Sequence, residues 1–184
     1  MKRFDFFKAL DQFCSYTKRE AVILKKQVYN RNNRSAFETE SERIFQETQT
    51  LLKTVTSQLY RAFITPIDAA DLYDLALALT KTIEKMNFVV HLQYDVDQTV
   101  LSMTDLIEKN CMDFSNACKS IQNPQPVFYD FDDSVYLYAL NALYGYGASV
   151  HVLQSFTTCT QLHEILQLCR TFFEKTERIK LKNR

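Results

Sequence analysis

The chain has 184 residues, of which 46% are hydrophobic and 13% are aromatic, so it can bury a sizeable core and is not a disordered chain. Its 22 Lys and Arg residues balance its 22 Asp and Glu residues, and a neutral chain has no overall field that recruits nucleic acid. Two glycines and three prolines are too few for the many tight corners of a β-sheet protein. The composition therefore predicts an all-α fold.

Apolar residues recur every three or four positions along most of the chain, which is the spacing of amphipathic helices packed in a bundle. The predicted helices cover residues 4–29, 34–63, 68–90, 97–121, 132–144 and 160–180, with room for one further helical turn at 150–153. Helices of about 25 residues are on the order of 35–40 Å long and fold back only as antiparallel neighbours. We therefore expect an elongated up-and-down helical bundle of about six helices.

The predicted core is the set of residues on these apolar stripes. It includes Phe7, Leu10, Cys14, Thr17, Ala21, Leu24 and Val28 in the first helix, and Phe37, Ile44, Leu51, Val55, Leu59 and Ala62 in the second. It continues with Leu72, Leu75, Leu79, Ile83, Met86 and Val90 in the third, and Val100, Thr104, Ile107, Cys111, Phe114, Cys118 and Ile121 in the fourth. The fifth helix carries Val135, Leu137, Ala139, Leu140 and Leu143, and the last helix packs Leu162, Ile165, Leu166, Cys169, Phe172, Phe173 and Ile179.

The five cysteines are odd in number and form no C-x-x-C pair, which indicates reduced thiols in a cytoplasmic protein. Cys111 and Cys118 lie on a core stripe, where cysteine acts as a small hydrophobic residue. His163 follows Cys159 closely, but proximity in sequence does not make a catalytic pair. The N-terminal stretch MKRFDFFKALDQF carries charges among its apolar residues, so we expect no signal peptide.

Residues 134–163 contain no Asp, Glu, Lys or Arg. Polar residues and glycines interrupt this segment too often for a membrane span. We interpret it as a buried segment or as a partner-facing one, including an interface between copies in a homo-oligomer.

The stretch LYRAFITPIDAADLYDLALALTKTIE, residues 59–84, joins the second and third predicted helices. Thr65 could cap a helix that has Pro66 in its first position and Asp68 in its third, and Asp68 with Asp71 could do the same three residues later. In either case the acids accept hydrogen bonds from free backbone N–H groups at the positive end of the helix dipole. Thr65, Asp68 and Asp71 are thus predicted to form a helix-capping junction.

Within this stretch, FITPIDAADLYDLALAL resembles the junction of the second and third helices in the PhoU-like family, in particular its Pit accessory protein branch. Phe63 to Asp68, Asp71, Leu75 and Ala76 carry the resemblance. It implies one domain over residues 1–184, made of two three-helix bundles with approximate halves 1–95 and 96–184. It also implies a cytoplasmic, non-enzymatic protein that works beside a Pit-type phosphate transporter.

Proteins of this family often carry acidic motifs on facing helices that hold iron, zinc or other cations. At the matching positions this chain has Lys81 and Arg170 beside Glu84 and Glu174, so we expect ion pairs there rather than a metal site. Should a divalent or ferric ion bind, its ligands would be Glu47, Glu84, Glu174 and Glu177. Otherwise no cofactor is expected.

The segment from residue 18 to 34 is strongly basic, with Glu20 as its one acid. Its cations are Lys18, Arg19, Lys25, Lys26, Arg31 and Arg34. They form either a solvated face or a surface that contacts anionic lipid or the acidic loops of a transporter.

The sequence contains no phosphate-binding glycine motif, and its three histidines have no histidine or cysteine partner at i+4. Three functions stay open from the residues alone. They are an accessory protein of phosphate transport that acts by protein contact, a metal-binding helical protein, and an oligomeric scaffold.

Overall fold

The structure is a computed structural model that describes residues 4–94, 96–123, 134, 137, 141 and 150–183, apart from the side chains of residue 31 and residues 150–153. Within this part of the chain all regular structure is helical. The helices are α1 (Phe6–Tyr29), η1 (Arg31–Asn33, a 3-10 turn), α2 (Arg34–Arg61), α3 (Ala69–His91), α4 (Gln98–Gln122) and α6 (Val150–Lys182). The all-α prediction is confirmed.

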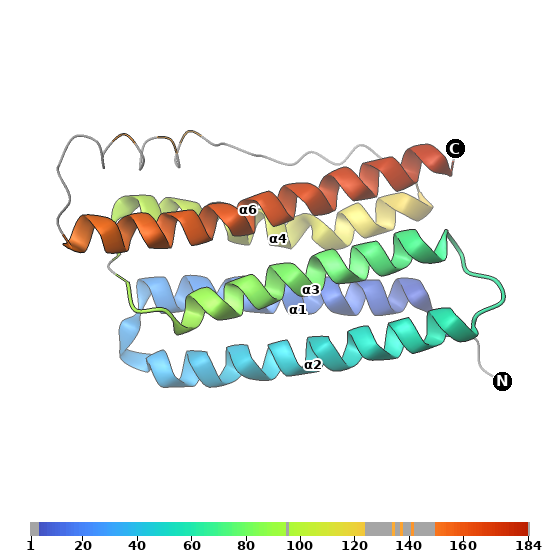
Figure 1. The fold of residues 1–184 in the computed structure, drawn as a ribbon, viewed down its shortest axis with the longest axis horizontal. Helices are drawn as coiled ribbons and strands as arrows, with labels where there is room; N and C mark the ends of the chain where they lie inside the picture. The colour runs from blue at the N-terminus through green and yellow to red at the C-terminus, as the bar shows by residue number, and fades with distance from the viewer. Residues whose placement is uncertain are drawn as a thin grey trace.

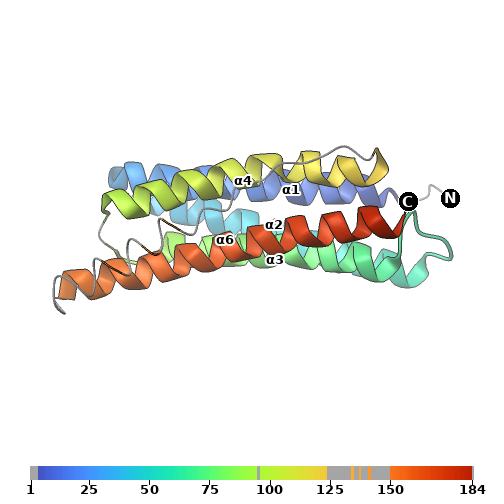
Figure 2. The ribbon, with the colours of Figure 1, turned by 90° about the horizontal axis from the view of Figure 1, so that it is seen from above.

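The α-helices lie along one long axis, with α1 and α3 running in one direction and α2, α4 and α6 in the other (Figure 1). Each of α1, α2 and α3 packs against the other two, while α4 packs against α1, and α6 packs against both α3 and α4. Figure 2 shows the same pairing from above, with α4 beside α1 and α6 beside α3. The start of α1, the connection from α2 to α3, and the ends of α4 and α6 all lie at one end of the bundle, which we call the junction end.

Aspartates define the starts of three helices. Asp5 accepts from the backbone N–H of Lys8 at 3.0 Å. Asp68 accepts from Ala70 at 2.8 Å, and Asp97 accepts from Val100 at 2.9 Å. Each carboxylate satisfies a backbone donor that has no partner inside its helix and places negative charge at the positive end of the dipole.

The predicted apolar stripes form the core. The stripe residues named above for α3, α4 and α6 are all buried, as are those of α1 apart from Phe7, which is partly buried. Four predicted residues of the second helix are also only partly buried, because α2 lies at the edge of the bundle and, among the described α-helices, packs on α1 and α3 alone; the four are Phe37, Leu51, Leu59 and Ala62. Leu137, predicted on the apolar face of the fifth helix, is 55% exposed instead. Phe114 of α4 lies against Phe172 and Phe173 of α6, with ring centroids 4.4 and 5.2 Å apart. The core is therefore continuous across the two predicted halves of the chain, because α1 packs on α4 and α3 packs on α6.

Most helix boundaries agree with the prediction to within two residues, but the predicted start of the last helix at Thr160 is wrong. α6 begins at Val150, and its early hydroxyl residues find partners: Thr158 donates to the carbonyl of Gln154 at 3.0 Å, and Ser155 donates to the side chain of Asp97. Burial of Cys159 on the core side then outweighs the weak helix propensity of these residues.

The helix predicted at residues 132–144 lies almost wholly outside the described residues, as does most of the uncharged segment that contains it. The part of that segment within α6 includes the buried residues Cys159 and Leu162. None of the helices described here is both long and apolar enough to cross a membrane.

Candidate interaction surface

The α2–α3 connection uses the second of the two predicted caps. The N-cap of α3 is Asp68, not Thr65. The Thr65 hydroxyl instead donates to the carbonyl oxygen of Ile67 at 2.6 Å, and Ile67 is buried with 8% of its surface exposed. The connection is therefore held at both Thr65 and Asp68.

Asp71 has a role that the sequence did not predict. Its side chain is 5% exposed, and its carboxylate pairs with Lys182 at 2.9 Å and with Arg178 at 3.8 Å. Lys175 pairs with Asp74 at 3.5 Å. These pairs fasten the end of α6 to the first turns of α3, over 100 residues away in the chain, which is why no local sequence pattern indicated them.

The same connection exposes large apolar side chains to solvent. Tyr60 is 89% exposed, Phe63 is 100% exposed and Ile64 is 64% exposed. These three residues, which we call the tip, lie at the junction end, where the α2–α3 connection projects past the helices (Figure 1). Leu181, in the last turn of α6 at that end, is 67% exposed. Burial patterns predict helix faces and say little about turns, so the sequence did not indicate this exposure.

Three of the six predicted surface cations are engaged within the fold. The ion pairs are Arg19 with Glu40 at 2.7 Å, Lys25 with Glu108 at 2.6 Å and with Asp105 at 3.0 Å, and Arg34 with Glu38 at 2.6 Å. Hydrogen bonds to Glu108 and Asp105 raise the pKa of Lys25. Arg34 also donates to the carbonyls of His91 and Leu92, so it closes the end of α3.

Lys18 and Lys26 are exposed, and no ion pair joins either of them to a residue that the structure describes. The side chain of Arg31 lies outside the described residues. The cations open to a partner on α1 are thus Lys18 and Lys26 rather than the whole predicted set.

The four predicted metal ligands are distributed over three helices. Glu47 pairs with Arg43, Glu174 with Arg170 at 2.9 Å, and Glu177 with Lys180. The expected ion pair at Arg170 and Glu174 is therefore confirmed. No cluster of three or more His, Cys, Asp or Glu side chains suited to a metal occurs in the described residues.

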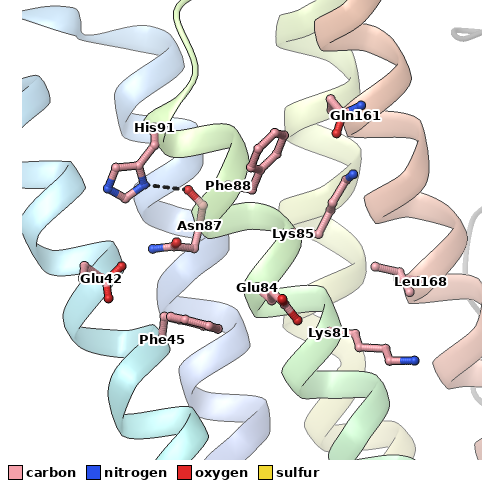
Figure 3. Close-up of a pocket in the computed structure, with 10 residues that line it drawn as sticks. All are labelled: Glu42, Phe45, Lys81, Glu84, Lys85, Asn87, Phe88, His91, Gln161 and Leu168. Carbon is pink, nitrogen blue, oxygen red and sulfur yellow. Dashed lines mark hydrogen bonds between the residues drawn. The ribbon is translucent and has the colours of Figure 1, made fainter.

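Glu84 lies instead in a shallow groove of about 630 Å³ on the face formed by α2, α3 and α6 (Figure 3). Phe45 and Phe88 contribute apolar walls, and Lys81 and Lys85 point toward α6. The Lys85 ammonium pairs with Glu164 and lies 5.4 Å from the centroid of the Phe88 ring. Opposite charges and apolar surface alternate here, so the groove presents no uniform field to an ion.

A buried polar network joins α1, α2 and α3 behind this groove. Ser41 donates to one oxygen of Glu20, and Asn87, which lines the groove, donates to Ser41 at 2.9 Å. Glu20 is 0% exposed, and its second carboxylate oxygen is buried without a hydrogen-bond partner. Burial raises the pKa of Glu20 to about 7, partly opposed by the Ser41 hydrogen bond.

Sequence reasoning did not single out Glu20, although a signal was present. Phe13, Thr17, Glu20, Leu24 and Gln27 follow one 4–3 stripe on α1, and all five are buried. An acid on an apolar stripe is a candidate buried carboxyl.

The cysteines are buried and unbridged. The Sγ atoms of Cys14 and Cys118 lie 3.6 Å apart across α1 and α4. Burial raises the pKa of Cys159 to about 12, and nearby Asp97 acts in the same direction. A nucleophilic cysteine needs the opposite change, so Cys159 has the environment of a structural thiol.

No family model matches the chain, and no curated protein matches it either.

Proposed function

We propose that this protein is a non-enzymatic, cytoplasmic accessory protein of inorganic phosphate transport that regulates a Pit-type transporter by binding. The observation that carries the proposal is the exposure of the tip within the stretch that resembles the PhoU-like family. Phe63 and Ile64 belong to that stretch and face solvent, with 100% and 64% of their surfaces exposed.

The residues of this stretch divide into two groups. Thr65, Asp68, Asp71, Leu75 and Ala76 hold the connection or pack inside the bundle. Phe63 contributes nothing comparable to folding, because burial is what makes an aromatic side chain stabilising. A binding role accounts for a phenylalanine in that position.

The packing supports the family's architecture as part of the same proposal. The mutual contacts of α1, α2 and α3 match what one three-helix bundle requires, and α4 and α6 would belong to a second. In this arrangement the transporter contacts the outer surface of the bundle. Lys18 and Lys26 on α1 are the cations we propose to contact acidic loops of the transporter.

Co-purification with a Pit-type transporter in detergent tests this function. We expect the wild-type chain to be retained and the double variant Lys18→Glu/Lys26→Glu to be retained less, because charge reversal replaces attraction by repulsion. The matched control is Lys53→Glu/Lys119→Glu, which makes the same charge change at exposed lysines of α2 and α4. Failure of the wild-type chain to bind would contradict the proposal.

A further inference from the structure

The exposed apolar surface of the described residues is concentrated at the junction end. The four most exposed large apolar side chains are those of Phe63, Tyr60, Leu181 and Ile64, at 100%, 89%, 67% and 64%. Others that are exposed, such as Phe88 at 49%, lie singly along the helices. Single exposed apolar residues are normal on a protein surface, whereas a group at one end indicates a binding surface.

The tip is held outward by its own turn. The Thr65 hydroxyl bonds to the Ile67 carbonyl at 2.6 Å, Ile67 is anchored in the core, and Asp68 caps α3 immediately afterwards. Phe63 therefore projects from a turn that is fixed at its C-terminal side. Its exposure is a property of this turn and does not require a loose loop.

Exposed cations lie at the same end of the bundle as the tip. Arg61 is exposed in the last turn of α2. Arg178 and Lys182 are 58% and 52% exposed while they neutralise Asp71, whose side chain is 5% exposed. Asp71 is buried while its cations reach solvent, and the exposed Asp68 is engaged in capping α3. Arg61, Arg178 and Lys182 are therefore the charges beside the tip that can meet an anionic partner.

Size and shape decide what kind of partner fits. An aromatic side chain buries about 150–250 Å² of surface. Phe63, Tyr60, Leu181 and Ile64 together can therefore bury on the order of 500 Å² against a partner. A stable protein interface buries about 800 Å² on each partner and needs a complementary surface. The four side chains fall short of that area, and two of them, Phe63 and Ile64, lie on the projecting α2–α3 connection (Figure 1). A lipid bilayer adapts to them, and its interfacial region favours aromatic side chains next to cations.

We infer that the tip enters the interfacial region of an anionic lipid bilayer, with Phe63 as its main anchor and Arg61, Arg178 and Lys182 against the headgroups. The long axis of the bundle then points away from the membrane, because the tip lies at its extreme end (Figures 1 and 2). This inference rests on the proposed function, since a protein that contacts a transporter through Lys18 and Lys26 meets it at the membrane.

Co-sedimentation of the full chain with lipid vesicles, in the absence of any transporter, tests the inference. We expect binding to vesicles of phosphatidylcholine mixed with phosphatidylserine, and weaker binding to phosphatidylcholine alone. Phe63→Ser/Ile64→Ser should reduce the partition coefficient by about tenfold or more, because the apolar anchor is lost. Phe88→Ser, at an exposed aromatic residue away from the tip, should bind like the wild type.

Three results would overturn the inference. They are no binding of the wild-type chain to either vesicle, equal binding by the tip variant, and an equal loss in the Phe88→Ser control. A different result would show that the tip binds a protein. In that case the wild-type chain does not bind vesicles, and the tip variant does not co-purify with the transporter in detergent. The inference then fails and the proposed function stands. If the wild type binds vesicles but not the transporter, membrane binding by the tip stands and the proposed function fails.

Discussion

The substitution Glu20→Gln tests the buried network directly. The folded state places the carboxyl of Glu20 where one oxygen has no partner, and its pKa rises from 4.5 to about 7. Each unit of pKa corresponds to about 1.4 kcal/mol, so ionising Glu20 inside the folded protein costs about 3 kcal/mol relative to the unfolded chain. Glutamine keeps the shape and removes the charge.

The pH dependence follows from the direction of this change. Because the folded pKa is the higher one, the folded state binds more protons than the unfolded state between 4.5 and about 7. The contribution of Glu20 to stability is therefore fully present below 4.5 and is lost as the pH rises through about 7. The free energy of unfolding of Glu20→Gln should equal that of the wild type below pH 4.5. At about pH 8 it should be larger by about 3 kcal/mol.

Urea unfolding followed by circular dichroism over this pH range measures the difference. The difference between variant and wild type isolates Glu20, since other titrating groups are common to both chains. Glu42→Gln, at an exposed carboxylate next to Ser41, is the matched control and should change stability by less than about 0.5 kcal/mol. A difference that is independent of pH, or a Glu20→Gln chain less stable at about pH 8, would refute the reasoning.

Three further predictions concern ion pairs, metal and thiols. Asp71→Asn should lower the free energy of unfolding by about 1–2 kcal/mol, because Lys182 and Arg178 lose their buried partner; unchanged urea unfolding would contradict this. Protein purified without chelator should have the same metal content as Glu84→Ala by elemental analysis, whereas stoichiometric iron or zinc lost in that variant would favour a metal-binding function. Cys159 should resist iodoacetamide at neutral pH until urea is added, because burial raises its pKa to about 12; rapid labelling of the native chain would show that the thiol is accessible.

The core could be predicted from sequence because helical periodicity is a local property. The stripe residues of α3 and α4 are buried as their three- and four-residue spacing indicates. The cap at Asp68 was one of two alternatives, and the structure selects it because Thr65 is used within the turn. These features depend on neighbours within a few residues.

The remaining features depend on residues far apart in the chain. Asp71 meets Lys182 only because α6 returns to the junction end. Ser41 and Asn87 reach Glu20 only when three helices pack together. The early turns of α6 gain stability from contacts such as that of Ser155 with Asp97, the N-cap of α4, which the hydroxyl-rich local sequence does not reveal. The exposure of Phe63 reflects the geometry of one turn.

Phosphate uptake by cells that express a Pit-type transporter, with and without this protein, tests the central claim most directly. If the protein acts by binding that transporter, its presence changes the uptake rate, and Lys18→Glu/Lys26→Glu abolishes most of the change while Lys53→Glu/Lys119→Glu keeps it. An uptake rate that is identical with and without the protein, at equal transporter levels, contradicts the claim.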